Sequence, residues 1–315
     1  MEELNYNKSR RSFVKQIAVS GAGLTLLSAC PTILFGKSKQ YEKITILHTN
    51  DVHSHIEPFP DNDPKYPGLG GVARRAELIN QIRKEEENVL LFDSGDIFQG
   101  TPYFNYFYGK PELELMSKMQ YDCATIGNHD FDNGIDGLNN VLPYASFPFV
   151  NVNYDFSKTI LDKKISPYKI FIKKGIKIGV YGLGVKLDGL VSPDLYQNTV
   201  YYEPVAIAQE TEKILKDKGC QLIVCLSHLG YTYKDERISD LKLAEQLKYT
   251  QLVLGGHTHT FLDNLVTVKN KFKNVVHINQ VGWAGIKLGR IDVLINKISS
   301  EKNITAYNTK VSKKQ

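Results

Sequence analysis

Five short polar segments each come directly after an apolar run that is typical of a β-strand. They are Asp51-Val52-His53, Gly95-Asp96, Gly127-Asn128-His129-Asp130, Ser227-His228 and Gly256-His257-Thr258-His259. In α/β sheets the strand ends open onto a common crevice, so side chains far apart in the sequence can meet there. The pattern therefore predicts one site built from carboxylate, amide and imidazole groups.

The body of the chain alternates apolar runs with amphipathic stretches. The predicted strands cover residues 44–48, 88–92, 123–126, 149–153, 169–173, 177–183, 221–226, 251–254, 275–279 and 287–295. The predicted helices cover residues 72–84, 111–119, 206–218 and 241–247. This alternation indicates an α/β domain with helices outside the sheet layers. Residues 299–315 are polar, and we expect them to form a frayed, weakly held tail.

The positive charge of the chain lies at its two ends. Of the net charge of +5, residues 1–40 contribute +4 and residues 301–315 contribute +3, which leaves −2 for residues 41–300. A nearly neutral body gives no reason to expect a surface for a nucleic-acid polymer, although the pI is about 8.7.

Residues 1–40 have the layout of a bacterial export signal. Arg10-Arg11 precedes an uncharged run over residues 17–36 and resembles a twin-arginine signal. Leu27-Ser28-Ala29-Cys30 also resembles a lipobox, which would leave a lipidated Cys30. Ordinary cleavage nearby and an uncleaved anchor are the alternatives. Each places the body in the periplasm or on the outer face of the envelope, with the signal or a lipid as its only membrane attachment.

The donor groups of the five segments suit a borderline to hard divalent cation such as Mn²⁺, Zn²⁺ or Fe²⁺. Cysteine is absent from all five segments, which argues against a structural zinc site. Two ions are the natural number, because one carboxylate can bridge a pair roughly 3.5–4 Å apart. Asp96 is central in the order of segments and is the best candidate for this bridge.

Taken in order, these motifs resemble the calcineurin-like metallophosphoesterase signature over roughly residues 42–295. Three stretches resemble the 5′-nucleotidase/UDP-sugar hydrolase branch more narrowly. They are Leu47-His48-Thr49-Asn50-Asp51-Val52-His53, Gly95-Asp96-x-x-Gln99-Gly100-Thr101-Pro102 and Gly127-Asn128-His129-Asp130-Phe131-Asp132. The resemblance implies a single domain over residues 41–298, folded as a four-layer α/β/β/α sandwich.

The resemblance also implies a role for each site residue. One metal ion would be held by Asp51, His53, Asp96 and His259, and the other by Asp96, Asn128, His228 and His257. His129 would be the catalytic imidazole and no ligand, oriented by Asp132. The ions would activate water and neutralise charge on the phosphate.

The implied activity is hydrolysis of nucleotide phosphate esters, most simply of 5′-monophosphates. A cyclic-nucleotide phosphodiesterase or nucleotide-sugar pyrophosphatase would use nearly the same chemistry and stays open. Enzymes of this branch carry a C-terminal domain that contacts the nucleoside, whereas this chain ends shortly after the motifs. A third alternative is therefore a lipid-tethered subunit that needs a separate chain carrying such a domain.

Several other polar and aromatic residues have a structural interpretation. His48, His55 and His277 are expected to pack or face solvent, Asp130 to support the Asn128 loop, and Arg74 and Arg75 to lie on a solvated helix face. The aromatic residues of 103–108 could stack on a base, but we expect core packing. Cys123, Cys220 and Cys225 are expected to be buried.

Overall fold

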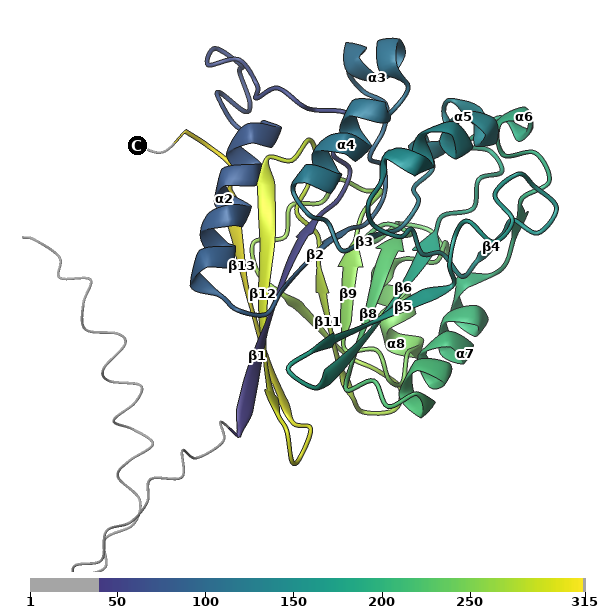
Figure 1. Cartoon of the computed structure of the whole chain (residues 1–315). Helices are drawn as coiled ribbons and strands as arrows, with labels where there is room; N and C mark the ends of the chain where they lie inside the picture. Colours follow the sequence, from purple (N-terminus) through teal and green to yellow (C-terminus); the bar gives the residue numbers. More distant parts are fainter. Residues whose placement is uncertain (1–39, 314–315) are drawn as a thin grey trace, which may run out of the picture. The chain divides into compact units, whose positions relative to one another are not determined.

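The computed structural model describes residues 40–313, which fall in one compact unit with two main sheets (Figure 1). The export-signal prediction for residues 1–40, including Cys30, lies outside the described residues apart from residue 40. The five-stranded sheet has the order β13 (Lys302–Lys310), β12 (Lys287–Asn296), β1 (Tyr41–Thr49), β2 (Val89–Asp93) and β3 (Cys123–Ala124). Within it β1, β2 and β3 are parallel, whereas β12 is antiparallel to both β1 and β13.

The six-stranded sheet also has a parallel centre and antiparallel edges. Its order is β10 (Val266–Lys269), β11 (Val275–Asn279), β9 (Leu252–Gly255), β8 (Leu222–His228), β6 (Ile176–Gly184) and β5 (Tyr168–Lys173). Strands β6, β8, β9 and β11 run parallel. A two-stranded pair, β4 (Tyr154–Asp155) with β7 (Val200–Tyr201), lies apart from both sheets.

Three hydrophobic clusters lie between four layers, which are two outer layers of helices and the two sheets between them. Strand β1 shows the principle, because Ile44 and Ile46 pack between the sheets while Leu47 faces the opposite side. Helices α2 (Val72–Glu85), α4 (Lys110–Lys118) and α5 (Gly134–Val141) share the cluster of Leu47. Helices α7 (Pro204–Asp217) and α8 (Asp240–Gln246) cover the six-stranded sheet (Figure 1). The predicted α/β/β/α sandwich is confirmed.

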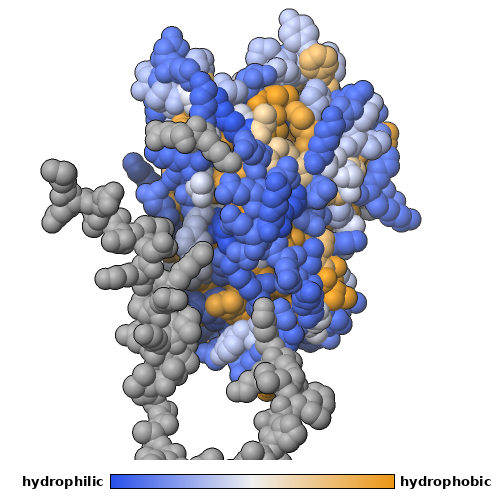
Figure 2. All heavy atoms as spheres, turned by 60° about the vertical axis from the view of Figure 1, so that its left-hand side comes forward, coloured by the Kyte–Doolittle hydropathy of each residue, from blue (hydrophilic) through white to orange (hydrophobic). Residues whose placement is uncertain are grey.

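The expected frayed tail over residues 299–315 is wrong for most of its length. Residues 302–310 form β13, which pairs with β12 from Lys287↔Lys310 to Ile295↔Lys302. Ile304 and Ala306 pack against the cluster between the sheets, and Val311 is buried. Side chains that point outward from an edge strand can be polar, so a polar sequence is compatible with β13. The face of the molecule that carries α2 and β13 is predominantly hydrophilic (Figure 2).

Other differences are local. The predicted strand at 149–153 is reduced to isolated bridges at Phe149 and Val150. The sequence pattern does not predict several short elements that lack a clear period, among them α3 (Pro102–Phe107), α6 (Pro193–Tyr196) and the 3₁₀ turns His129–Phe131 and Leu142–Tyr144. Among residues 40–313, no helix combines the length and hydrophobicity that crossing a bilayer requires.

The predicted structural residues lie mostly where expected. Cys123, Cys220 and Cys225 are buried free thiols. His48 is fully buried between the sheets, where its Nε2 lies 3.0 Å from Asn279 Oδ1. Burial lowers the pKa of His48 to about 4, so the ring is a neutral core residue at physiological pH.

Candidate metal centre

The polar segments meet at the carboxyl ends of five strands, as the sequence predicts. Strands β1, β2 and β3 end just before the segments with Asp51, Asp96 and Asn128. In the other sheet β8 ends at His228 and β9 ends two residues before His257. The parallel strands of each sheet point the same way, so these ends share one edge. Six of the seven predicted ligands form two groups that could each hold a cation.

The first group consists of Asp51, His53 and His259. His53 Nε2 lies 3.0 Å from His259 Nε2, and His259 Nε2 lies 3.3 Å from Asp51 Oδ1. Asp51 is fully buried and also accepts hydrogen bonds from the Asn50 amide (2.6 Å) and the His257 backbone N–H (3.0 Å). Asp51 thereby joins a loop of the five-stranded sheet to one of the six-stranded sheet.

The second group consists of Asp96, His228 and His257. Asp96 Oδ2 lies 3.0 Å from His228 Nε2 and 3.7 Å from His53 Nε2, so this carboxylate stands between the two groups. Asn128, the seventh predicted ligand, places its Oδ1 2.8 Å from His257 Nδ1. All seven predicted ligand residues are therefore brought together.

Two histidines make hydrogen bonds that leave one ring nitrogen free to bind a cation. His53 Nδ1 donates to the Phe98 carbonyl (3.2 Å) and His228 Nδ1 to the Ser94 carbonyl (2.7 Å), so each Nε2 can present a lone pair. His228 Nε2 is buried, and Asp96 Oδ2 is its close polar neighbour at 3.0 Å. His53 Nε2 and His259 Nε2 lie 3.0 Å apart, close enough for both to bind one cation when each nitrogen is unprotonated.

Five of the candidate ligands have a left-handed backbone, which side chains other than glycine rarely adopt. Their φ angles lie between 50° and 70°, and they are Asp51, His53, Asp96, His257 and His259. Such residues persist when the surroundings hold them firmly, and they concentrate at functional sites. The backbone conformation thus marks the same residues as the side-chain geometry.

His129 lies beside the two groups and belongs to neither. Its Nδ1 lies 2.8 Å from Asp132 Oδ2, and its backbone N–H donates to Asp96 Oδ1 at 2.8 Å. The hydrogen bond to Asp132 raises the pKa of His129, although burial opposes the rise. The His129 side chain is 38% exposed, so its Nε2 can reach a bound molecule.

Asp130 holds the loops that carry Asp96 and Asn128, as its predicted supporting role requires. Its carboxylate accepts backbone N–H groups from Asp96 (3.1 Å), Ile97 (2.9 Å), Phe98 (3.2 Å) and Gly127 (2.8 Å). Burial raises the pKa of Asp130, and the nearby Asp96 carboxylate adds to the rise. Asp130 is thus a structural residue.

Replacing Asp130 with alanine should lower the free energy of unfolding by at least about 3 kcal/mol, because several buried N–H groups lose their acceptor at about 1–3 kcal/mol each. Urea unfolding of the metal-free protein measures the difference. The exposed Asp162 provides the matched control, since Asp162→Ala should change the midpoint little. Equal stability of the two variants would contradict the supporting role.

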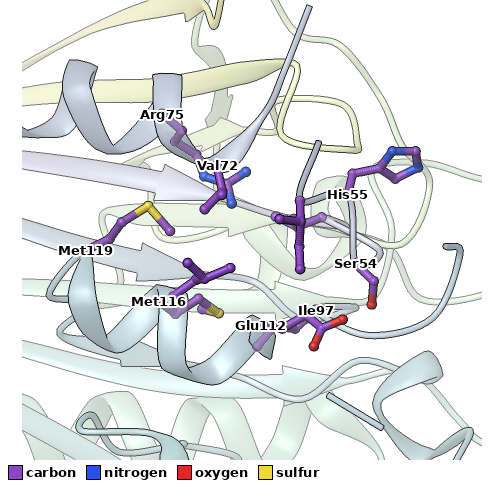
Figure 3. A pocket seen from close by; sticks show the side chains of 11 residues that line it. Ser54, His55, Val72, Arg75, Ile97, Glu112, Met116 and Met119 are labelled. Carbon is purple, nitrogen blue, oxygen red and sulfur yellow. The ribbon is translucent and has the colours of Figure 1, made fainter. Parts of the chain in front are cut away.

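A small cavity lies behind the segment that carries His53, between α2 and α4. It has a volume of about 20 Å³, room for about one water molecule, and is too small for a substrate. Figure 3 shows Ser54, Arg75 and Glu112 among its lining residues. Each has buried polar atoms without a hydrogen-bond partner in the described part of the chain. The solvated position predicted for Arg75 is therefore wrong, because this side chain is buried.

Aromatic residues around the site were only partly predicted. The His259 ring stacks on Trp283 with centroids 5.7 Å apart, and His55 packs between Phe59 and Trp283. In the 103–108 stretch Phe104 is buried, but Tyr106, Phe107 and Tyr108 are more than half exposed. Core packing is therefore wrong for these three. Trp283 lies in a loop that carries no motif, so no sequence signal indicates its place beside His259.

Comparison with known proteins agrees with this geometry. The sequence profile described as calcineurin-like phosphoesterase matches residues 44–261. The snake venom 5′-nucleotidase of Naja atra is 37% identical over 228 residues, which covers 70% of this chain and 42% of that protein. The 5′-nucleotidase of Homo sapiens is 34% identical over 250 residues, which covers 76% of this chain and 42% of that protein.

A solved structure supports the same assignment. The 5′-nucleotidase precursor from Thermus thermophilus superposes with a TM-score of 0.78 and 31% identity, covering 85% of this chain and 54% of that one. This chain spans about two fifths of the length of the two 5′-nucleotidases from Naja atra and Homo sapiens. Because the profile match includes all seven candidate ligands, the chain belongs to the calcineurin-like phosphoesterase family.

Proposed function

We propose that the protein is a two-metal phosphoesterase that hydrolyses nucleotide phosphate esters, most simply 5′-monophosphates. The observation that carries the proposal is the pair of adjoining cation groups with His129 beside them. The relatives named 5′-nucleotidase support the nucleotide as substrate. We assign Asp51, His53 and His259 to one ion, Asn128, His228 and His257 to the other, and Asp96 to both.

The proposed mechanism divides the work between the ions and the chain. When bound, two divalent ions supply positive charge to the phosphate and make water acidic enough to react near neutral pH. Asp132 accepts the Nδ1–H of His129 and thereby fixes the ring and favours its charged form. His129 Nε2–H donates to an oxygen of the phosphate or of the leaving group, which stabilises the negative charge that develops there.

A metal-dependent assay tests the proposal. The purified protein is loaded with Mn²⁺, Zn²⁺ or Fe²⁺ and given nucleoside 5′-monophosphates, cyclic nucleotides, nucleotide sugars and glycerol 2-phosphate. We expect turnover of the monophosphates, and its loss on chelation. Protein that binds two ions per chain but hydrolyses none of these esters would overturn a stand-alone enzyme and leave the partner-dependent subunit.

We also propose that the protein is exported and, more specifically, that a lipid on Cys30 attaches it to the membrane. The support is the Arg10-Arg11 signal pattern in the sequence, together with relatives described as a venom protein and a precursor. Changing both arginines to lysine should retain the protein in the cytoplasm. The intact mass of membrane-extracted protein then tests acylation of Cys30.

A further inference from the structure

A pocket larger than the cavity near His53 lies at the end of the six-stranded sheet where His228 and His257 are found. Its volume is about 410 Å³, which is within the range of small-molecule sites. Two loops form it: residues 185–190 after β6, and residues 233–238 after β8. The register of these parallel strands pairs Gly184 with His228, so both loops leave the sheet beside a candidate metal ligand. The pocket therefore opens at the same edge as the metal centre.

One wall of the pocket touches the segment that carries His257 and His259. The Tyr233 hydroxyl donates to the Leu229 carbonyl at 2.6 Å. A Cβ placed on Gly230 would lie 2.3 Å from Tyr233 Oη and 2.7 Å from Thr258 Cγ2, so these two side chains are close neighbours. Tyr233 thus stands next to the residue between the two histidines.

Another lining residue, Tyr201, is connected by ring packing to the segment that carries His129. Tyr201 lines the pocket, and its ring centroid lies 6.2 Å from that of Tyr154. Tyr154 in turn packs edge-on against Phe131, with centroids 5.8 Å apart. Phe131 is in the same 3₁₀ turn as His129. Packing contacts thus link Tyr233 to the segment with His257 and His259, and Tyr201 to the turn with His129.

The lining chemistry suits a nucleoside. The rings of Tyr201 and Tyr233 line the pocket and can stack on a base. The Arg237 guanidinium already covers one face of the Tyr233 ring, 4.1 Å from its centroid, which leaves the other face for the base. Carboxylates are present as well, at Asp188, Glu203 and Glu236. Carboxylate oxygens accept hydrogen bonds from sugar hydroxyls.

We infer that this pocket, which we call the Tyr233 pocket, holds the base and ribose of a nucleotide whose phosphate lies at the metal centre. The inference rests on the proposed function and adds the specificity-determining part of the same site. The cavity near His53 cannot take this role, because it has room for about one water molecule.

The test compares substrates that differ in the group carried by the phosphate. Tyr233→Ala should lower kcat/KM for a nucleoside 5′-monophosphate about tenfold or more, and should lower it much less for glycerol 2-phosphate, since stacking on the base is lost. Tyr233→Phe keeps the ring and should retain most of the nucleotide activity. Tyr202→Ala is the matched control, because Tyr202 is the 46% exposed neighbour of Tyr201 and does not line the pocket.

A binding measurement separates this inference from the proposed function. Calorimetry with adenosine or uridine and metal-free protein should show binding that Tyr233→Ala weakens about tenfold and Tyr202→Ala leaves unchanged. This readout holds even if no ester is hydrolysed, an outcome that would overturn the activity alone. Absent nucleoside binding, or equal losses of kcat/KM for the nucleotide and glycerol 2-phosphate in Tyr233→Ala, would overturn the Tyr233 pocket.

Discussion

Replacing His129 with asparagine is expected to lower kcat by about 10²–10⁴-fold, the usual contribution of a positioned acid or base. The metal content should not change, because the His129 ring is outside both cation groups. Its contact with Asp96 runs through the backbone N–H, which asparagine keeps. Steady-state kinetics and elemental analysis of the same preparation measure the two quantities.

Asp132→Asn provides a graded companion to this experiment. The amide can still contact His129 Nδ1, but it no longer supplies the negative charge that favours the protonated ring. We therefore expect a smaller loss of kcat than for His129→Asn, again at constant metal content. Loss of bound metal from His129→Asn would show that this imidazole is a ligand, and the catalytic assignment would fail.

Replacing Gly127 with alanine is expected to lower both metal content and activity, with kcat/KM falling about 100-fold or more. A Cβ at this position would lie 2.2 Å from Asp96 Oδ1 and 2.5 Å from the Asp96 backbone nitrogen. Contacts this short must be relieved by moving Asp96, the carboxylate between the two groups. Elemental analysis and kinetics after metal loading measure the effect.

Gly175→Ala is the control for a general effect of adding a methyl group. A Cβ on Gly175 would meet nothing within 4 Å, although its φ of +82° makes alanine there unfavourable by about 1–2 kcal/mol. Gly175→Ala should therefore be less stable while it binds metal and substrate normally. If Gly127→Ala bound as much metal as the unchanged protein, the proposed bridging role of Asp96 would be contradicted.

The sequence was sufficient to place the site because its signals are local. The apolar runs before Asp51, Asp96 and His228 predict strands, and parallel strands must bring their ends to one edge. That inference needs only strand positions and the alternation of elements, which hydrophobic patterning reports well. The four layers were implied by the family resemblance that the motifs carry, and not by the patterning.

The parts that could not be predicted depend on tertiary contacts. Nothing in the residues themselves shows that the Phe98 and Ser94 carbonyls orient His53 and His228. Polar β13 resembles a tail in its sequence, because its stabilising partner is the edge of β12 and its inward side chains are few. The left-handed backbone at the ligands was equally hidden, since it goes against the preference of each residue.

Both candidate cation groups draw donors from each of the two sheets. Asp51 and His53 follow a strand of the five-stranded sheet and His259 a strand of the six-stranded sheet, and the second group is divided in the same way. An ion bound by residues from both sheets would act as a crosslink between them, and the unfolded chain has no such binding site. Its binding energy therefore becomes folding energy, about 2.7 kcal/mol when free metal is about a hundred times its Kd. Metal supply would then set how long the protein survives as well as how fast it works.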